Sequence, residues 1–243
     1  MHVYSIYLTT YNISSGDLLN YDKSKSDKSR AGSLGCAVLH NVAGKQVRGF
    51  LTAAHVGLYE GNNIYYGGKK NEITPVYMGI VTKKFQMKGK VDACIISDGM
   101  GTATSVFNYT GKTGDGKWIG YQRTSPLSTW PWPFSTKVYA YGAASGAMSG
   151  YINNLLTSVE VRYEVDGPAQ AFNDFYSTSL GAQRGDSGCA VVVPYNNSYS
   201  MVGIVTGSRY KGKVDIMPGP KESETLVCQI QEINKAFNSS VSK

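Results

Sequence analysis

The residues best suited to chemistry in this sequence are a serine and the small residues around it, in Gly185-Asp186-Ser187-Gly188. A serine hydroxyl is a poor nucleophile at neutral pH unless a neighbouring base takes its proton. The flanking glycines favour a tight turn that presents the hydroxyl and directs backbone N–H groups toward the same point. The same residues are common in ordinary turns, so the loop indicates a nucleophile only if suitable partners exist.

The base for this serine would come from one of three histidines, His2, His40 or His55. His55 follows Thr52-Ala53-Ala54, and such small residues let an imidazole emerge from a closely packed strand end. Asp92 stands at the head of an apolar run that ends at Ile96. A buried carboxylate needs partners to offset its desolvation, and orienting a histidine is a natural use. Structural roles for His55 and Asp92 are the simpler alternative.

The composition favours a β-rich protein. The 243 residues include 28 glycines and 18 tyrosines, and only 17% are charged, a balance typical of many strands and turns. This length can bury a sizeable core, as one large all-β domain or two small barrels. No run of about 18 apolar residues predicts a membrane span. Residues 1–12 are too polar for a secretion signal, so either a leader has been removed or export does not use that route.

The net charge of +7 and the four cysteines limit which partners and cofactors can be expected. A basic surface could attract an anionic polymer, although a solvated lysine-rich surface is the simpler interpretation. No aromatic-interleaved motif predicts specific nucleic-acid binding. None of the cysteines has Cys-x-x-Cys spacing, so neither zinc nor any other cofactor is predicted, and zero, one or two disulfides remain open. The cysteines are Cys36, Cys94, Cys189 and Cys228.

Short strands must position these residues. Apolar runs between turn residues predict strands at 34–40, 49–54, 63–66, 74–81, 91–96, 137–141, 159–165, 190–194 and 201–208. Glycines at 142, 146 and 150 predict a strand–turn–strand with close backbone approach. We expect a polar surface arm and loop at 13–33 and a long connection at 99–133. Apolar residues at 226, 230, 233 and 237 have helical spacing and predict a C-terminal helix.

Taken together, these motifs resemble the chymotrypsin-like serine proteases, in which histidine, aspartate and serine follow in this order. The likeness covers roughly residues 13 to 238 and is strongest to the bacterial streptogrisin and α-lytic branch. The residues that carry it are Thr52-Ala53-Ala54-His55, Asp92, Gly185-Asp186-Ser187-Gly188, Val202-Gly203-Ile204-Val205-Thr206-Gly207, Ile13-Ser14-Ser15-Gly16-Asp17, Ser33-Leu34-Gly35 and the glycines at 142, 146 and 150.

The resemblance implies an all-β, trypsin-like fold of two antiparallel six-stranded β-barrels with a short C-terminal helix and an active site between the barrels. It divides the chain into an N-terminal arm (1–30), a first barrel with its connection (31–120) and a second barrel with the helix (121–243). It also implies that His55, Asp92 and Ser187 form the catalytic triad of a serine endopeptidase. The N–H groups of Gly185 and Ser187 would form the oxyanion hole.

Substrate-binding roles follow from the same resemblance. Gly181 would lie at the base of the primary pocket, Thr206-Gly207-Ser208 would form one wall, and Arg184 would stand at the mouth. Without an aspartate at Gly181, a preference for lysine or arginine is not expected, and small wall residues favour a large apolar side chain. Arg184 with Ser208 would suit an acidic side chain, but glutamate-cutting relatives have a histidine where this chain has Val205.

The sequence departs from the family at two places. Bacterial members pair the aspartate before the serine with a buried arginine, and the matching residue here is Ala140. Asp186 would then need Lys137, Arg123 or a freed N-terminus as its partner. In addition, Val56 stands where many relatives have cysteine, and Cys189 replaces a frequent glycine, so the usual disulfides are not implied.

Three functional hypotheses follow. The leading one is a serine endopeptidase, monomeric and secreted, that acts on protein or peptide substrates, with an intracellular location as the alternative. The second is a protease-like binding protein without catalysis, suggested by the missing arginine at Ala140. The third is a basic module that binds an anionic surface, suggested by charge alone.

Overall fold

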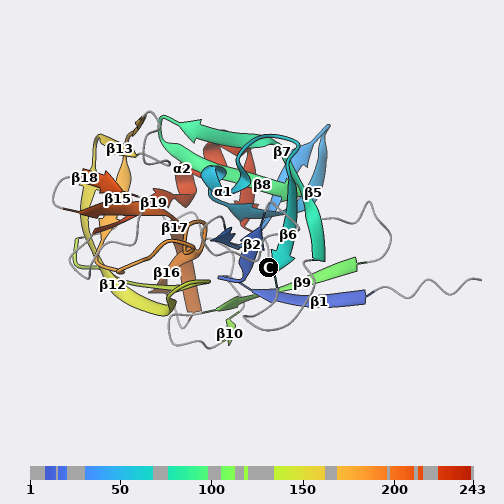
Figure 1. Ribbon diagram of the computed structural model, residues 1–243, viewed down its shortest axis with the longest axis horizontal. Coiled ribbons are helices and arrows are strands. Elements are labelled where there is room, and N and C mark those ends of the chain that lie inside the picture. The colour runs from blue at the N-terminus through green and yellow to red at the C-terminus, as the bar shows by residue number, and fades with distance from the viewer. Residues whose placement is uncertain are drawn as a thin grey trace, which may run out of the picture.

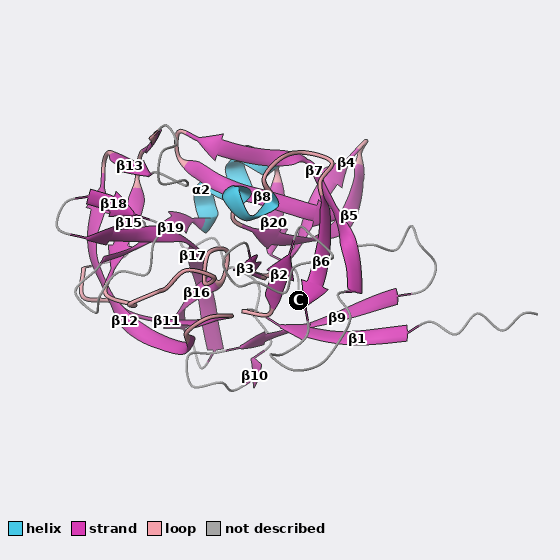
Figure 2. Ribbon diagram, in the orientation of Figure 1, coloured by secondary structure: helices cyan, strands magenta, loops and turns pink. Residues whose placement is uncertain are grey.

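The computed structural model of the protein describes residues 9–14, 16–20, 31–67, 76–97, 105–112, 118–119, 134–161, 169–195, 198–210, 213–215 and 224–241. These residues form mostly strands, with two helices among them, α1 (Ala54–Gly57) and α2 (Ile230–Phe237). The strands fall into two groups that lie side by side in Figures 1 and 2. Neither helix has the length and apolarity needed to cross a membrane.

Eight strands from both ends of the chain form the first sheet, in the order β20-β4-β5-β8-β7-β6-β2-β3. All of its neighbouring strands are antiparallel. Within the described residues no pairing joins β20 to β3, so the sheet is a half-barrel. Its strands are β2 (Leu18–Asn20), β3 (Ala31–Ser33), β4 (Ala37–Val42), β5 (Lys45–Thr52), β6 (Asn63–Gly67), β7 (Val76–Lys88), β8 (Val91–Ser97) and β20 (Ser239–Val241).

Seven strands form the second sheet, in the order β16-β11-β12-β15-β19-β17-β18. An additional antiparallel pairing of β16 with β17 closes six of the seven strands into a barrel. The strands are β11 (Lys137–Gly142), β12 (Gly146–Leu156), β15 (Phe175–Thr178), β16 (Ala190–Tyr195), β17 (Ser198–Tyr210), β18 (Lys213–Asp215) and β19 (Glu224–Gln229).

Two small sheets complete the described structure. In one, β9 (Ser105–Lys112) pairs in parallel with β1 (Thr9–Ser14) and antiparallel with β10 (Trp118–Ile119). In the other, β13 (Val159–Val161) pairs antiparallel with β14 (Gln170–Phe172).

The burial of side chains explains why these segments are strands. Along β12, buried and exposed positions alternate from Ala147 to Ile152, as expected for a strand with one face on a core. In β8, by contrast, every residue from Val91 to Ile96 is buried, which matches its continuous apolar sequence. The carboxylate of Asp92 is therefore held inside the protein by a strand packed on both faces.

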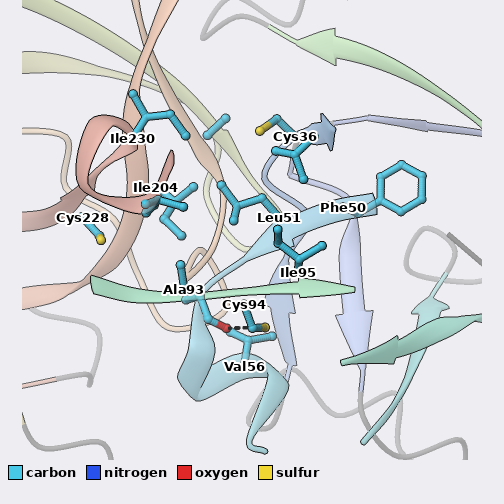
Figure 3. Close-up of a cluster of buried hydrophobic side chains, with 14 of the residues drawn as sticks. Cys36, Phe50, Leu51, Val56, Ala93, Cys94, Ile95, Ile204, Cys228 and Ile230 are labelled. Carbon is cyan, nitrogen blue, oxygen red and sulfur yellow. Dashed lines mark hydrogen bonds between the residues drawn. The ribbon is translucent and has the colours of Figure 1, made fainter. Parts of the chain in front are cut away.

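The hydrophobic core of the first sheet extends across the boundary between the two halves. Figure 3 shows Ile204, Cys228 and Ile230 from the second half beside Leu51 and Ala93 from the first. The closed barrel has a second, separate core, built on Val138, Val191, Val205 and Val227 with other buried side chains. Because one core is shared, the two halves are fixed against each other at the place where the site residues meet.

The predicted all-β, trypsin-like fold is confirmed, with differences of detail. Part of the segment predicted as a surface arm and loop pairs into the first sheet as β2 and β3, and Leu19 is fully buried there. The predicted connection at 99–133 contains β9 and β10, and its other residues lie outside the described ranges. The predicted helix starts at Ile230, because the preceding apolar residues belong to β19. The division of the chain at residues 30 and 120 stays a prediction.

Candidate active site

His55 is presented by a single helical turn, α1, immediately after β5 ends at Thr52. The two alanines before it are fully buried, which allows the turn to pack closely against β8. The imidazole itself is 13% exposed. The residue predicted as a base thus reaches the surface from a rigid, buried support.

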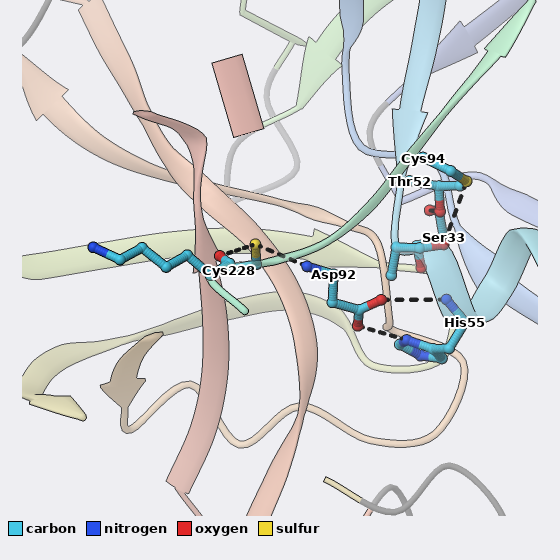
Figure 4. A network of polar contacts seen from close by, with 8 residues as sticks. Ser33, Thr52, His55, Asp92, Cys94 and Cys228 are labelled. Carbon is cyan, nitrogen blue, oxygen red and sulfur yellow. Dashed lines mark hydrogen bonds and ion pairs between the residues drawn. The ribbon is translucent and has the colours of Figure 1, made fainter. Parts of the chain in front are cut away.

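The Asp92 carboxylate binds His55 through both of its oxygens. Asp92 Oδ2 lies 2.8 Å from His55 Nδ1, and Asp92 Oδ1 accepts the His55 backbone N–H at 3.3 Å (Figure 4). Asp92 is 0% exposed, and its own N–H donates to Cys228 Sγ at 3.4 Å. Because a carboxylate can only accept, the proton of the neutral imidazole lies on Nδ1 and the Nε2 lone pair is left for another proton.

The loop that carries Ser187 lies against the strand end that carries His55. The Ser187 carbonyl accepts the Ser33 N–H at 2.7 Å. At Gly188 (φ +93°) a Cβ would come within 2.2 Å of Thr52 Oγ1, so only glycine allows this approach. At Gly32 a Cβ would touch both the Val56 side chain and the Ser187 carbonyl. Ser187, which is half-buried, is therefore packed beside the residues that flank His55.

Two backbone N–H groups of this loop remain available. Among the described residues, neither the Gly185 N–H nor the Ser187 N–H has a hydrogen-bond partner. The neighbouring N–H groups are used: Asp186 N donates to Gln183 O at 3.0 Å and Gly188 N to Val205 O at 2.7 Å. An arrangement in which alternate N–H groups are committed and the others are free suits an anionic oxygen.

Asp186 has a different set of partners from those predicted. Its buried carboxylate accepts the backbone N–H groups of Ala144 at 2.9 Å and Ser145 at 3.0 Å, and the Ser145 hydroxyl at 2.6 Å. It also accepts Gln183 N–H at 2.8 Å. The turn between β11 and β12 therefore supplies three of the four hydrogen bonds that the described residues donate to Asp186.

None of the three predicted partners of Asp186 is among these donors. Lys137 is exposed, and its ammonium lies 5.2 Å from the centre of the Tyr139 ring. Arg123 and the N-terminus lie outside the described residues. The prediction missed the turn because backbone N–H groups leave no signal in a sequence.

The predicted pocket residues lie beside the loop and differ in exposure. Gly181 (φ +70°) is half-buried, and Arg184 is exposed. Thr206, Gly207 and Ser208 are buried in β17. The adjacent Ala182 N–H donates to the Thr225 hydroxyl at 3.0 Å, so Thr225 fixes the irregular segment that precedes the loop.

Sequence reasoning also missed Ser33, Ser145 and Thr225 as supports of the site. Each is a hydroxyl residue in an ordinary setting, and only the contact across the fold distinguishes it. Ser33 lies in a run that the resemblance includes, which is the nearest thing to a signal.

The cysteines are all buried free thiols, so no disulfide forms between them. Burial raises the pKa of each thiol well above its usual value. Two of them approach the site: Cys94 Sγ lies 3.6 Å from Ala53 O, and Cys228 accepts from Asp92. Among the described residues no group of three His, Cys, Asp or Glu side chains is placed to hold a metal.

Comparison with known proteins adds the class of fold. No protein-family model matches the chain, and no curated protein matches its sequence. Solved structures of three serine proteases match nearly all of it. Nocardiopsis protease matches with a TM-score of 0.65 at 17% identity, over 96% of this chain and 100% of that one. Cellulomonas bogoriensis chymotrypsin matches with a TM-score of 0.57 at 18% identity, over 96% of this chain and 99% of that one. A glutamic-acid-specific serine protease matches with a TM-score of 0.63 at 17% identity, over 95% of this chain and 100% of that one.

The chain therefore has the two-barrel fold of the chymotrypsin-like bacterial serine proteases. The resemblance noted in the sequence is confirmed at the level of the fold.

Proposed function

We propose that this protein is a serine endopeptidase in which Ser187 is the nucleophile, His55 the general base and Asp92 the residue that orients the imidazole. The observation that carries the proposal is the buried Asp92 carboxylate bound to His55 Nδ1 at 2.8 Å, on a support packed against the Ser187 loop. The fold similarity supports it as an analogy.

In the proposed reaction, Ser187 Oγ attacks the carbonyl carbon of a peptide bond while His55 Nε2 takes the hydroxyl proton. The carbonyl oxygen becomes an anion, which the N–H groups of Gly185 and Ser187 would bind. The C–N bond then breaks as the imidazolium returns the proton to the leaving amine, and an acyl-enzyme remains. Water, activated by the same imidazole, attacks the ester and releases the carboxylate product and free Ser187.

Asp92 would stabilise the imidazolium that forms in both halves of this cycle. Its oxygens are already committed to His55, so little reorganisation is needed when the charge appears. Because Asp92 is fully buried, the attraction is not weakened by direct contact with solvent.

We further propose that the primary pocket accepts a large apolar side chain. Gly181 contributes no side chain, and Val205, beside the wall residues, is buried and apolar. One of the compared structures is described as using a histidine triad to bind glutamic acid. Of the three histidines here, His55 binds Asp92 and His40 is buried in β4 of the first sheet. A pocket of three histidines therefore cannot be assembled.

The binding-protein alternative loses its sequence argument. It rested on the missing arginine at Ala140, but Asp186 has four hydrogen bonds from other donors. The anionic-surface hypothesis still rests on charge alone.

A fluorophosphonate probe tests the proposed activity. We expect covalent labelling of Ser187, located by peptide mass spectrometry, and loss of labelling in His55→Ala and Ser187→Ala. Ser239→Ala is the control, since this serine lies in β20 and its hydroxyl donates to Asn234 Oδ1, a contact that involves none of the proposed site residues. Folded wild-type protein that stays unlabelled contradicts the proposal. Cleavage of a peptide library by the active protein then tests the pocket preference.

Monomeric state and secretion also belong to the proposal. The free thiols are compatible with a reducing compartment, so an intracellular site is the alternative to export. Fractionation of the producing cells, with detection of the native chain by antibody, distinguishes the two.

A further inference from the structure

The Ser33 side chain lies at a junction of three segments that are far apart in the sequence. Ser33 ends β3 in the first sheet and is fully buried. Its hydroxyl donates to the Gly185 carbonyl at 2.8 Å and accepts the Ala143 N–H at 2.9 Å. A single oxygen thus connects the first sheet, the β11–β12 turn and the proposed oxyanion loop.

We infer that Ser33 is a positioning residue for the oxyanion hole, an inference that rests on the proposed function. Its hydroxyl would hold the Gly185–Asp186 peptide in the orientation that keeps the Gly185 N–H directed toward the reacting carbonyl. Ser33 would touch neither the substrate nor the reacting atoms.

Gly185 needs such an external support because its own conformation is weakly restricted. Its φ is +100°, a region that glycine enters freely, and no side chain limits its rotation. The carbonyl of the Gly185–Asp186 peptide is held by Ser33, and the N–H of the same peptide is held by Gln183 O. The Gly185 N–H belongs to the preceding peptide, so with both ends of the Gly185–Asp186 plane fixed its direction is restrained from one side of the Gly185 Cα.

The next peptides of the loop are fixed in the same way, partly by Ser33 itself. The Ser33 backbone N–H binds the Ser187 carbonyl at 2.7 Å, and Val205 O accepts the Gly188 N–H at 2.7 Å. The Asp186 carbonyl accepts the Cys189 N–H at 3.0 Å. The two N–H groups without partners among the described residues are therefore each followed along the chain by peptides that hydrogen bonds hold in place.

A hydroxyl serves both of its partners at this position. The Gly185 carbonyl requires a donor and the Ala143 N–H requires an acceptor, and serine supplies both in a small volume. Alanine would leave a buried carbonyl and an N–H unpaired, and the loop would relax to satisfy them. The Ser33 main chain would stay in place, because Thr52 Oγ1 donates to its carbonyl at 2.9 Å.

The test compares Ser33→Ala and Ser33→Thr with wild type and with Ser239→Ala. Ser239→Ala makes the same change and also removes one hydroxyl hydrogen bond, to Asn234, away from the loop. The best peptide from library profiling is used in two forms, as a p-nitroanilide substrate and as a trifluoromethyl ketone. The ketone forms a tetrahedral adduct whose oxygen occupies the oxyanion hole. Thermal unfolding and near-UV circular dichroism check that each variant is folded.

We expect Ser33→Ala to lower kcat by about 10- to 100-fold with KM changed by less than about threefold. The inhibition constant of the ketone should rise by the same factor as kcat falls, because both report binding of the oxyanion. Ser33→Thr should recover most of the wild-type kcat and ketone affinity, and Ser239→Ala should change neither kcat nor ketone affinity. If Ser33→Ala does not fold, Ser33→Cys, with a weaker donor of similar shape, should give intermediate values for both constants.

Two results overturn the inference while leaving the proposed function intact. One is an active wild type with a folded Ser33→Ala whose kcat and ketone affinity are unchanged. The other is a loss of kcat with unchanged ketone affinity, which would place the effect outside the oxyanion hole. If the wild type cleaves no library peptide and binds neither probe nor ketone, the proposed function fails and the inference fails with it.

Discussion

The hydroxyl of Ser145 donates to the Asp186 carboxylate at 2.6 Å, from the turn of one hairpin to the loop that carries the proposed nucleophile. Together with the N–H groups of Ala144 and Ser145, it surrounds the carboxylate with donors of the same turn. Among the described residues, the donors to Asp186 are dipoles and none of them is a cation. Such an arrangement depends on the shape of the turn, and the loop geometry is tied to it.

We predict that Ser145→Ala destabilises the protein by about 1.5–3 kcal/mol, the range for hydrogen bonds to charged groups. The backbone N–H groups of Ala144, Ser145 and Gln183 still donate to Asp186, so the variant should still fold and should react with a fluorophosphonate more slowly than wild type. Urea unfolding measures the first effect and time-resolved labelling the second. Ser145→Thr keeps the hydroxyl and serves as the control; equal stability of Ser145→Ala and wild type would contradict the role of this contact.

Asp92→Asn should leave the fold intact and lower kcat by about 10⁴-fold, because an amide can turn its NH₂ toward Nδ1 and favour the wrong tautomer. Steady-state kinetics on a cleaved peptide measure the loss. Asp174→Asn is the matched control: Asp174 forms an ion pair with Lys90 at a partly exposed position away from His55. Its kcat should stay within about twofold of wild type, since exposed pairs contribute little. Equal activity of Asp92→Asn and wild type would remove Asp92 from the mechanism.

Gly142→Ala should displace the Asp186 carboxylate by steric contact. A Cβ at this position would lie 2.2 Å from Asp186 Oδ1 and 2.6 Å from its Cγ, so the turn and the loop must separate. We expect a loss of stability larger than the roughly 1–2 kcal/mol that a left-handed alanine costs, together with slower probe labelling. Gly44→Ala provides that reference, because Gly44 has φ +82° and open space around it. Equal losses in the two variants would mean that the loop tolerates the contact.

Stability should fall as the pH drops below about 6.5, the usual pKa of histidine. His40 is buried, both its ring nitrogens lack partners among the described residues, and burial and the charge of Lys84 lower its pKa. Above this pH the His40 imidazole is neutral in both the folded and the unfolded chain. Below it the unfolded chain binds a proton at His40 that the folded chain does not, so the free energy of unfolding decreases.

His40→Leu should flatten this dependence. Urea unfolding at pH 7.5 and pH 5 measures the slope in each protein. An identical slope in His40→Leu and wild type would assign the pH dependence to other groups.

The four thiols should not react with alkylating reagents in the native state. All are buried with raised pKa values, so little thiolate is available to react. Iodoacetamide followed by mass spectrometry should modify none of them without denaturant and all four in urea. Addition of a reductant should leave the melting temperature unchanged; a decrease would reveal a disulfide.

The sequence was sufficient for the residues whose chemistry is unusual in their setting. An aspartate at the head of an apolar strand and a histidine after two alanines predicted a contact that the structure shows at 2.8 Å. The donors to Asp186 at Ala144 and Ser145 were not predicted, because a charged partner was sought and backbone dipoles of a turn leave no signal in a sequence.

The arrangement of the sheets was also only partly predictable. Alternation of apolar residues located most strands, but strand partners depend on contacts distant in sequence. Nothing local to Ser239–Val241 indicates that it adds to β4, some 200 residues earlier, at a register set by His40 and Ser239. The same reason hid Ser33, whose hydroxyl has ordinary neighbours in the sequence and unusual ones in space.

The pairing of β20 with β4 has a consequence for biosynthesis. One edge strand of the first sheet, residues 239–241, comes some 200 residues after β4, the strand with which it pairs. During translation β4 therefore keeps an open edge until the strands of the closed barrel have been made. The sheet that holds His55 and Asp92 cannot be completed before the second half of the chain, so the two halves do not mature as independent folding units.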